Sequence, residues 1–532
     1  MTLPPKVYTF LCGCFAALGS ITYGYDLGVI AGVIVAPAFL NRMDNPSADY
    51  TGFIVSSMLL GALCGSVPAA LVADKFSRRA AILAFAIVFL LGGSLQTGAM
   101  NRGMMLAGRF FAGLGIGGLT VLAPLYQSEI AHPSIRGRLT TLQQFFLGIG
   151  ALLASFVVYG CTRNYPGTVF EWRFPLALQL SPAVPLAGLI FLFPESPRWL
   201  VAHGREDDAR RSLARLHASG DETDVFVVSQ LAEIKVAVQE ERRQTAKWSR
   251  FVTDKQAFRK VMIGIILQFS VQMTGVSAIQ YFAPAIFKGF GFGTEQTLLL
   301  QSINSIIAII GEISCIVFVD RLGRRLPLIW CNMAVGSTFI VVIILQALFP
   351  PTDAGVFNVG AGRTFVAMTW IFNFFFSAGI GPLSFAIPVE ILSTDLRAKG
   401  SALAAMSCWI SNFMIGQITP KALATSQWRY YLLFAICGFT NALTFWAILP
   451  ETKGRSLEEM DMYFEETPWL VLGKTGKIKQ KDAEDRLRQG IVAGGAAGGA
   501  QGQWGDEESA GDHAGEIKKS ATGDVGVNTL DA

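Results

Sequence analysis

The sequence DKFSRR at residues 74–79 recurs as DRLGRR at residues 320–325, about 250 residues further along the chain. Two other charged motifs recur in the same order: Glu129 ahead of Arg136-Gly137 matches Glu390 ahead of Arg397 and Lys399-Gly400, and PESPR at residues 194–198 matches PETKGR at residues 450–455. A unit with three charged motifs has therefore been duplicated, and the chain is expected to fold as two similar halves.

Long apolar runs separate these motifs. Of the 532 residues, 52% are hydrophobic and 15% are charged, whereas a soluble domain carries about 25% charged residues. Twelve runs of about 20 to 30 residues are each long enough to cross roughly 30 Å of hydrocarbon as a helix. The predicted spans are residues 8–37, 51–73, 79–99, 104–128, 140–161, 173–194, 258–287, 297–319, 326–349, 363–392, 402–421 and 427–449. The fold class predicted is an all-α membrane protein.

The polar segments set the expected organisation of the chain. Four parts are predicted: a six-helix half at 1–194, a linker at 195–257, a second six-helix half at 258–466 and a low-complexity, disordered tail at 467–532. Two charged amphipathic helices, at 206–217 and 231–243, are expected in the linker. The first run carries Asp26 and lacks a convincing cleavage site, so it is interpreted as a retained helix.

Basic residues gather in the loops after spans 2, 4, 6, 8 and 10. Because basic loops stay in the cytoplasm, both termini are expected on that side. The net charge of +4 reflects this asymmetry and gives no support for a nucleic-acid partner. The lipid bilayer is the expected surrounding, and no obligate protein partner is evident.

Residues that would carry an enzymatic reaction are not grouped in this sequence. The eight cysteines have no metal-ligand spacing with histidine, and the four histidines are dispersed. A Walker motif is absent, which argues against an ATP-driven pump. The sequence therefore predicts neither an enzyme nor a metal or cofactor site.

The duplicated charges have a shared physical interpretation. An acidic residue at one helix end can clamp the arginine pair of the next loop, and such pairs can hold the cytoplasmic face closed until it opens. The alternative is a set of static surface salt bridges, worth about 0–1 kcal/mol each. The predicted cytoplasmic gate comprises Arg78, Arg79, Glu129, Arg136, Glu195, Arg198, Arg324, Arg325, Glu390, Arg397 and Glu451.

Five motifs in this order resemble those of sugar porters of the major facilitator superfamily, and in detail those of fungal proton-coupled monosaccharide transporters. The motifs are GYDLG at 24–28, GRF at 108–110, PESPRWL at 194–200, RLGRR at 321–325 and PETKGR at 450–455. The resemblance covers roughly residues 8–460. It implies the superfamily's twelve-helix fold, with a substrate site between two halves that alternate in access.

Asp26 and Arg109 are the candidate proton-coupling residues. A carboxylate inside a span is costly and points to function, and Arg109 in span 4 falls at a similar depth. The resemblance implies that protonation of Asp26 releases Arg109 and lets span 1 shift. A permanent structural ion pair in a uniporter is the alternative, although relatives that only equilibrate sugar usually lack this carboxylate.

The candidate sugar site also follows from the resemblance. Sugars need amide donors and acceptors together with flat apolar faces. The matching positions are Gln144, Gln272, Trp409 and Tyr23, although an intramembrane glutamine can also serve only to join helices. The sequence departs from the family where a glutamine is replaced by Val271, an asparagine by Ser277, a tryptophan by Phe385 and an amide by Cys408.

The predicted function is a sugar:proton symporter of the plasma membrane, whose partners are a sugar and a proton. A hexose is the default substrate, while a pentose, polyol, disaccharide or sugar acid stays open. A facilitative uniporter and a transporter-like sugar sensor are the rival hypotheses. Glu312, about 12 Å from the end of span 8, is interpreted as a partner for a loop arginine or as a second proton site, and we favour the structural role.

Overall fold

The computed structural model describes residues 4–132, 136–243, 250–349, 358–392, 394–453, 460, 463–464 and 467–471. Within these residues the regular secondary structure is helical. The predicted tail therefore lies almost entirely outside the described part of the chain, as do the side chains of Arg136 and Arg397.

The described helices include eleven segments that are long and apolar enough to cross a membrane. The first half contains α1 (Pro5–Ala16), α2 (Leu18–Val33), α3 (Pro37–Arg42), α4 (Ala48–Lys75), α5 (Arg78–Thr97), α6 (Arg102–Ile130), α7 (Arg136–Asn164), α8 (Phe170–Leu178), α9 (Ala183–Leu189) and η1 (Ile190–Leu192). The second contains α14 (Lys255–Met273), α15 (Val276–Lys288), α16 (Thr294–Leu322), α17 (Arg325–Leu348), α18 (Val359–Phe375), η2 (Phe376–Ile380), α19 (Gly381–Ile391), α20 (Thr394–Ser426) and α21 (Trp428–Ile448).

Helix α20 completes the twelve spans. It is 33 residues long but carries Ser407, Ser411, Asn412 and Gln417 within its apolar stretch, and these lower its hydropathy. It occupies the position of the predicted span at 402–421. Every predicted span thus coincides with one helix or with two or three consecutive helical segments in the structure.

Two spans of the second half, spans 7 and 10, are each interrupted partway along their length. Span 7 breaks between α14 and α15 at Gly275, whose φ of 88° is left-handed, a conformation glycine adopts without a steric penalty. Span 10 passes from α18 through the π-helical turn η2 into α19, where Pro382 removes a backbone donor. Irregular turns of this kind inside a membrane are typical of functional sites.

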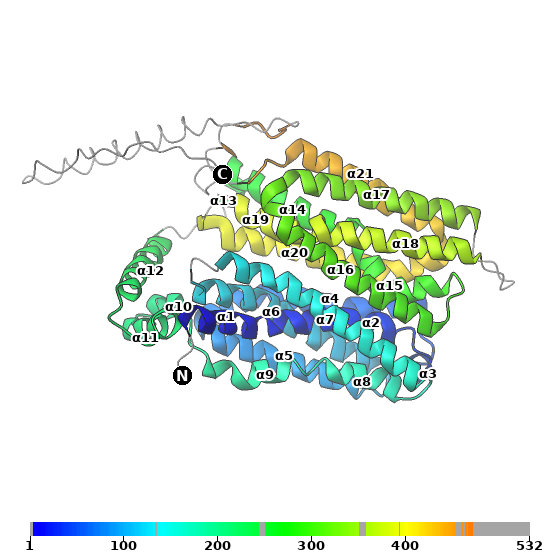
Figure 1. Ribbon diagram of the computed structural model, residues 1–532, viewed down its shortest axis with the longest axis horizontal. Helices are drawn as coiled ribbons and strands as arrows, with labels where there is room; N and C mark the ends of the chain where they lie inside the picture. The colour runs from blue at the N-terminus through cyan, green and yellow to red at the C-terminus, as the bar shows by residue number, and fades with distance from the viewer. Residues whose placement is uncertain are drawn as a thin grey trace, which may run out of the picture. The chain divides into compact units, whose positions relative to one another are not determined.

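The two halves meet along three pairs of helices. Helix α4 packs along α20, α7 along α16, and α2 against α15. Figure 1 shows the blue-to-cyan helices of the first half below the green-to-orange helices of the second. We call the end of this bundle at which the linker helices lie the linker end, and the opposite end, where α3 lies, the far end (Figure 1).

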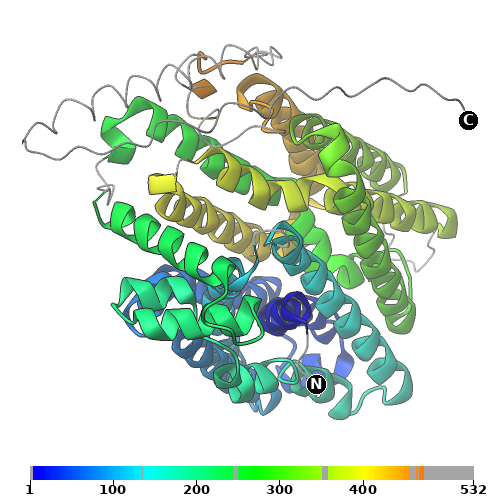
Figure 2. The ribbon, with the colours of Figure 1, turned by 60° about the vertical axis from the view of Figure 1, so that its left-hand side comes forward.

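The linker forms a small helical cluster against the first half. It contains α10 (Pro197–Ala202), α11 (Glu206–His217) and α12 (Val225–Arg243), followed by α13 (Arg250–Thr253). Its apolar core includes Trp199, Leu213 and Val227, and the Trp199 indole donates to the carbonyl of Asp74 at 3.0 Å. Figure 2 shows these helices beside α1 from a second direction.

One linker helix begins earlier than the sequence predicts. The expected helix at 231–243 starts at Val225 because the carboxylate of Asp224 accepts the backbone N–H of Phe226 at 2.7 Å and caps the first turn. The other predicted linker helix, 206–217, coincides with α11.

Candidate functional site

A fully buried ion pair joins α2 to α6 in the first half. The Asp26 and Arg109 side chains are 0% and 1% exposed, and Arg109 Nη1 lies 2.8 Å and 3.0 Å from the two carboxylate oxygens of Asp26. Arg109 Nε also donates to the carbonyl of Ile54 on α4 at 3.3 Å. The guanidinium therefore ties three helices together through one charge.

This arrangement makes the pair sensitive to protonation. Both charges have lost their water, so their mutual attraction must offset a large desolvation cost. Adding a proton to Asp26 would leave the Arg109 cation buried with only a carbonyl to hold it. The structure thus brings the two predicted proton-coupling residues together as one buried pair, and their coupling role stays a prediction.

Two residues of the second half that are predicted to contact sugar, Gln272 and Ser277, belong to a hydrogen-bonded group around the break in span 7. Gln272, at the end of α14, is hydrogen-bonded to Ser277 at the start of α15 and donates to Cys408 Sγ on α20 at 3.4 Å. Ser277 Oγ also lies 2.9 Å from Oδ1 of Asn412. The break at Gly275 allows residues on both sides of it to reach the same point.

Asn412 is a member of this group that the sequence reasoning missed. It is 5% exposed and stands three residues after Trp409, on the same face of α20. That spacing was the available signal. Its amide lies beside Ser277, the position at which the sequence lacks the asparagine expected from the resemblance.

Aromatic side chains from the two halves meet near this group. The rings of Tyr23 on α2 and Trp409 on α20 lie 5.7 Å apart, centroid to centroid. Gln144 is half-buried on α7, while its neighbour Gln143 is hydrogen-bonded to Ser20 and Gln127. The helix-joining role considered for Gln144 thus falls to Gln143.

Phe385 lies apart from the other predicted residues. Its side chain on α19 is 53% exposed, whereas Gln272 and Trp409 are buried. The contacts described for this region do not link it to Gln272, Ser277 or Trp409. Its part in a substrate site stays a prediction.

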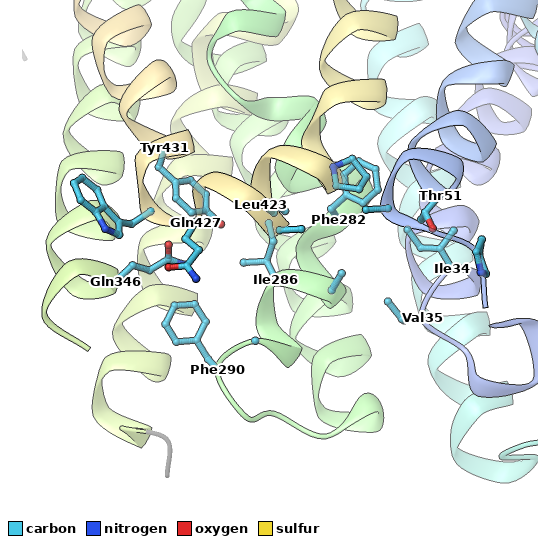
Figure 3. A pocket seen from close by; sticks show the side chains of 17 residues that line it. Ile34, Val35, Thr51, Phe282, Ile286, Phe290, Gln346, Leu423, Gln427 and Tyr431 are labelled. Atoms are coloured by element: carbon cyan, nitrogen blue, oxygen red, sulfur yellow. The ribbon is translucent and has the colours of Figure 1, made fainter. Parts of the chain in front are cut away.

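A cavity of about 400 Å³ opens between the halves at the far end. Figure 3 shows Ile34, Val35 and Thr51 on one side and Gln346, Gln427 and Tyr431 on the other. Phe282 and Ile286 of α15 lie between these two groups. None of the predicted sugar-contacting residues lines it, so this largely apolar vestibule is separate from the polar group around Gln272.

Charged pairs at the linker end hold the first half together. Arg78 makes two bonds to the Glu129 carboxylate, at 2.9 Å and 3.0 Å, and a third to Asp74 at 2.8 Å. Arg79 donates to Glu195 at 3.0 Å. These pairs link α4, α5 and α6 to the start of the linker.

The second copy of the motif uses its acidic residue differently. Arg324 Nε lies 3.3 Å from Glu390, as in the first half, but Glu451 accepts the backbone N–H groups of Arg324 and Arg325 at 2.9 Å and 3.2 Å. The guanidinium of Arg325 donates instead to the carbonyl of Trp446. The expected clamp between Glu451 and an arginine side chain is therefore replaced by a helix cap.

One residue difference between the copies explains this change. Ser77 caps α5 with its own hydroxyl, which accepts the N–H of Ala80 at 3.1 Å. Gly323 stands in the same place before α17 and has no side chain to offer. A Cβ on Gly323 would lie 2.6 Å from Glu451 Oε2. The glycine therefore leaves space for the Glu451 carboxylate, which caps the helix in place of a serine hydroxyl.

All of the described gate pairs join elements within one half. Arg78, Arg79, Glu129 and Glu195 belong to the first half and its linker junction, while Arg324, Arg325, Glu390 and Glu451 belong to the second. Arg198 lies in α10. The side chains of Arg136 and Arg397 lie outside the described residues, so a gating role for the set stays a prediction.

Hydrogen bonds and ion pairs between the halves are found toward the far end, among them Arg163 of α7 with Glu295 of α16 at 3.5 Å. Asp49 on α4 pairs with Lys421 on α20 at 3.2 Å, and Lys288 donates to the carbonyl of Val35 at 2.9 Å. Ser56 also donates to Gln417 at 2.6 Å. These contacts close the far end over the buried Asp26–Arg109 pair.

The fold and site together define a membrane transporter built from two six-helix halves. The model of the family described as sugar (and other) transporter matches residues 12–464. The chain therefore belongs to this family of the major facilitator superfamily, which is a family of transporters and not of enzymes.

Similar proteins agree in length and architecture. The chain is 31% identical over 511 residues to an MFS glucose transporter of Aspergillus flavus, covering 92% of this chain and 95% of that one. It is 29% identical over 479 residues to high-affinity glucose transporter 1 of Candida albicans, covering 87% of each. The xylose transporter XylE of E. coli, in a partially occluded inward open conformation, matches with a TM-score of 0.71 at 23% identity, covering 85% of this chain and 100% of that one. This last likeness confirms the predicted twelve-helix fold.

Proposed function

We propose that this protein is a sugar:proton symporter that imports a monosaccharide by alternating access between its two halves. The observation that carries the proposal is the buried Asp26–Arg109 pair, in which both side chains are at most 1% exposed. A buried ion pair contributes little net stability, because the cost of desolvation offsets the attraction between the charges. A carboxylate inside a membrane span therefore points to ion coupling rather than to a structural role.

The proposed cycle uses the contacts already described. The linker end is cytoplasmic and the far end faces outward, as the distribution of basic loops suggests. Opening of the far end separates Asp49 from Lys421 and admits water to Asp26. Protonation of Asp26 loosens Arg109 from α2, sugar binds among Gln144, Gln272, Asn412 and Trp409, and the halves then rock to open the linker end.

The names of similar proteins support the class of substrate. The relatives in A. flavus and C. albicans are named as glucose transporters, and one structure of XylE is described as a proton:xylose symporter bound to a brominated glucose. We propose a hexose or pentose, held by amides and by the ring faces of Trp409 and Tyr23.

Uptake into proteoliposomes tests the coupling. With an alkaline interior, wild-type protein is expected to accumulate sugar above its outside concentration. Asp26→Asn removes the titratable group, so accumulation is expected to fall at least about tenfold while sugar exchange without a gradient persists. Uptake that ignores the gradient and is unchanged in Asp26→Asn would leave a passive carrier.

A panel of sugars in the same assay defines the substrate. Hexoses, pentoses, polyols, sucrose and galacturonate are each offered at two pH values. A hexose or pentose is expected to compete best with labelled glucose, while preference for sucrose or galacturonate would contradict the proposed monosaccharide site.

The uniporter hypothesis has one structural observation in its favour. Arg109 bonds to Ile54 as well as to Asp26, so the pair also has a purely architectural use. The pH-gradient experiment separates the two functions. Deletion of residues 472–532 tests the sensor hypothesis, because a transporter is expected to keep its uptake without them.

A further inference from the structure

The seam between α7 and α16 follows a regular register. Ser155 on α7 meets Ser305 on α16 at 3.3 Å, and Gly148 on α7 faces Glu312 on α16. In each helix these two positions are seven residues apart, which is two turns on one face. Since the residue number rises along α7 as it falls along α16, the two helices are antiparallel. Gly148 and Ser155 of α7 and Ser305 and Glu312 of α16 thus form one stripe along which the helices pack.

Glu312 is the acidic member of this stripe. Its side chain is 7% exposed, and Oε2 is sealed from solvent without a hydrogen-bond partner among the described residues. A Cβ placed on Gly148 would lie 2.6 Å from that oxygen, so the glycine lets the carboxylate lie in its present position between the halves. The partner in a loop arginine that we favoured for Glu312 is not found among the described ion pairs.

In the described part of the chain, the helices around Glu312 supply no opposite charge at its level. Its own helix and the neighbouring α7, α15, α17, α18 and η2 carry these ionisable residues in the described part of the chain: Tyr159, Cys161 and Arg163; Tyr281 and Lys288; Glu295, Cys315 and Arg321; Arg325 and Cys331; Arg363. The cations among them stand at helix ends. The thiols of Cys315 and Cys331 are neutral near pH 7.

A carboxylate that is 7% exposed and has no paired cation among the described ion pairs is most stable in its neutral form. An ionised carboxylate without a paired cation or hydrogen-bond donors bears the full cost of desolvation. Parting α7 from α16 would admit water and allow the proton to leave. The protonation of Glu312 is thereby tied to whether this seam is open or closed.

We propose that Glu312 is a second proton-binding site, which holds a proton while the seam is closed and exchanges it with water when the halves part. This inference rests on the proposed symport and adds a second transported proton to it. Asp26 binds its proton against a fixed cation, whereas Glu312 binds its proton in exchange for water. Movement of the two halves loads and unloads both sites in one cycle.

Sugar accumulation at equilibrium counts the protons. Proteoliposomes hold an interior one pH unit more alkaline than the outside, and potassium with valinomycin clamps the membrane potential at zero. Each coupled proton then contributes about tenfold to the inside-to-outside sugar ratio. Two protons predict a ratio of about 100 for the wild type, one proton about 10, and no coupling a ratio of about 1.

The wild-type result alone separates the two proposals. A ratio near 1 would overturn the symport, and with it the second site. A ratio near 10 would leave the symport standing and overturn the role of Glu312. This measurement depends on no variant and so holds even if a substitution impairs folding.

Variants then assign the protons. Glu312→Gln copies the protonated form and is expected to lower the ratio to about 10 while retaining sugar exchange, and Glu312→Asp is expected to restore about 100. Ser305→Ala, two turns along the same stripe, is the matched control and is expected to keep about 100. A Glu312→Gln ratio equal to wild type, or a folded Glu312→Gln protein without exchange, would refute the proposal.

Discussion

At the scale of single residues, the proposed substrate site takes its hydrogen-bonding groups from other helices than the resemblance implies. Ser277 occupies a position at which the resemblance leads one to expect an asparagine, yet Asn412 of α20 lies within 2.9 Å of its hydroxyl. Gln272 reaches the same hydroxyl from α14. The polar character lost from span 7 is thus supplied by α20, and the site is less depleted than its span 7 sequence suggests.

Asn412→Ala tests this compensation. Removing the amide leaves Ser277 with Gln272 alone and takes a hydrogen-bonding group from the proposed sugar site, which is expected to weaken sugar binding by about 1–3 kcal/mol and to raise KM about 5- to 150-fold. The measurement is sugar uptake by proteoliposomes at a series of concentrations. Ser314→Ala is the control, because the Ser314 hydroxyl donates to the carbonyl of Ile310 within its own helix, α16. An unchanged KM in Asn412→Ala would place the substrate elsewhere.

At the scale of helices, the duplicated arginine motifs differ in burial. The Arg78 and Glu129 side chains are 9% and 6% exposed, whereas those of Arg324 and Glu390 are 18% and 31% exposed. A pair that is mostly withdrawn from water leaves a costly charge behind when one member is removed, while a more exposed pair does not. The two copies of the motif are therefore expected to stabilise the protein by different amounts, although their sequences are similar.

Arg78→Ala and Arg324→Ala form a matched comparison. Removing the Arg78 side chain leaves the buried Glu129 carboxylate without this cation, and is expected to lower the free energy of unfolding by about 3–5 kcal/mol. Removing the Arg324 side chain is expected to lower it by about 1 kcal/mol or less. Thermal unfolding of the purified variants in detergent gives the order. Equal decreases in Tm, or a larger decrease for Arg324→Ala, would contradict the argument from burial.

The linker docks on the first half through a cluster of aromatic rings. His132 follows α6, His217 ends α11 and Phe226 begins α12; the His132 ring stacks on Phe226 at 4.8 Å and lies 5.4 Å from His217. Burial, together with the neighbouring His132, lowers the pKa of His217 from its usual 6.5 to about 4. The packed linker therefore holds His217 in its neutral form.

Acidification is expected to loosen this docking. Between pH 6.5 and about 4 the undocked linker binds a proton at His217 that the docked linker excludes, so the stabilisation is complete above pH 6.5 and is lost as pH falls toward 4. Hydrogen exchange, corrected at each pH for the intrinsic exchange rate of an unprotected amide, is expected to show less protection of α11 and α12 at pH 5 than at pH 7.5. His217→Phe should reduce this difference and His203→Phe should retain it; an equal pH response in all three proteins would exclude His217 as the cause.

At the scale of the whole molecule, the far end closes through backbone contact. A Cβ on Gly52 of α4 would lie 2.5 Å from the carbonyl oxygen of Gln417 on α20, so the two halves touch there without an intervening side chain. Asp49 pairs with Lys421 one turn away.

Gly52→Leu is expected to hold the far end open. The added side chain does not fit the contact and is expected to destabilise the closed far end by about 1–3 kcal/mol. Sugar uptake is then expected to be at least about tenfold slower, with sugar binding retained. Gly188→Leu, at an exposed position with open space around it, is the control. Wild-type uptake by Gly52→Leu would show that closure does not bring these backbones together.

The sequence by itself determined the number of spans, the two halves and the position of the linker, because hydrophobic length and a duplicated motif are one-dimensional properties. It also singled out Asp26 and Arg109, since a charge within an apolar run is conspicuous. Only the tertiary structure decided that Asn412 joins Ser277, that Glu451 caps a helix beside Gly323, and that Glu312 lies unpaired against Gly148. Each of these depends on a contact between helices distant in sequence, where packing geometry and not composition selects the partner.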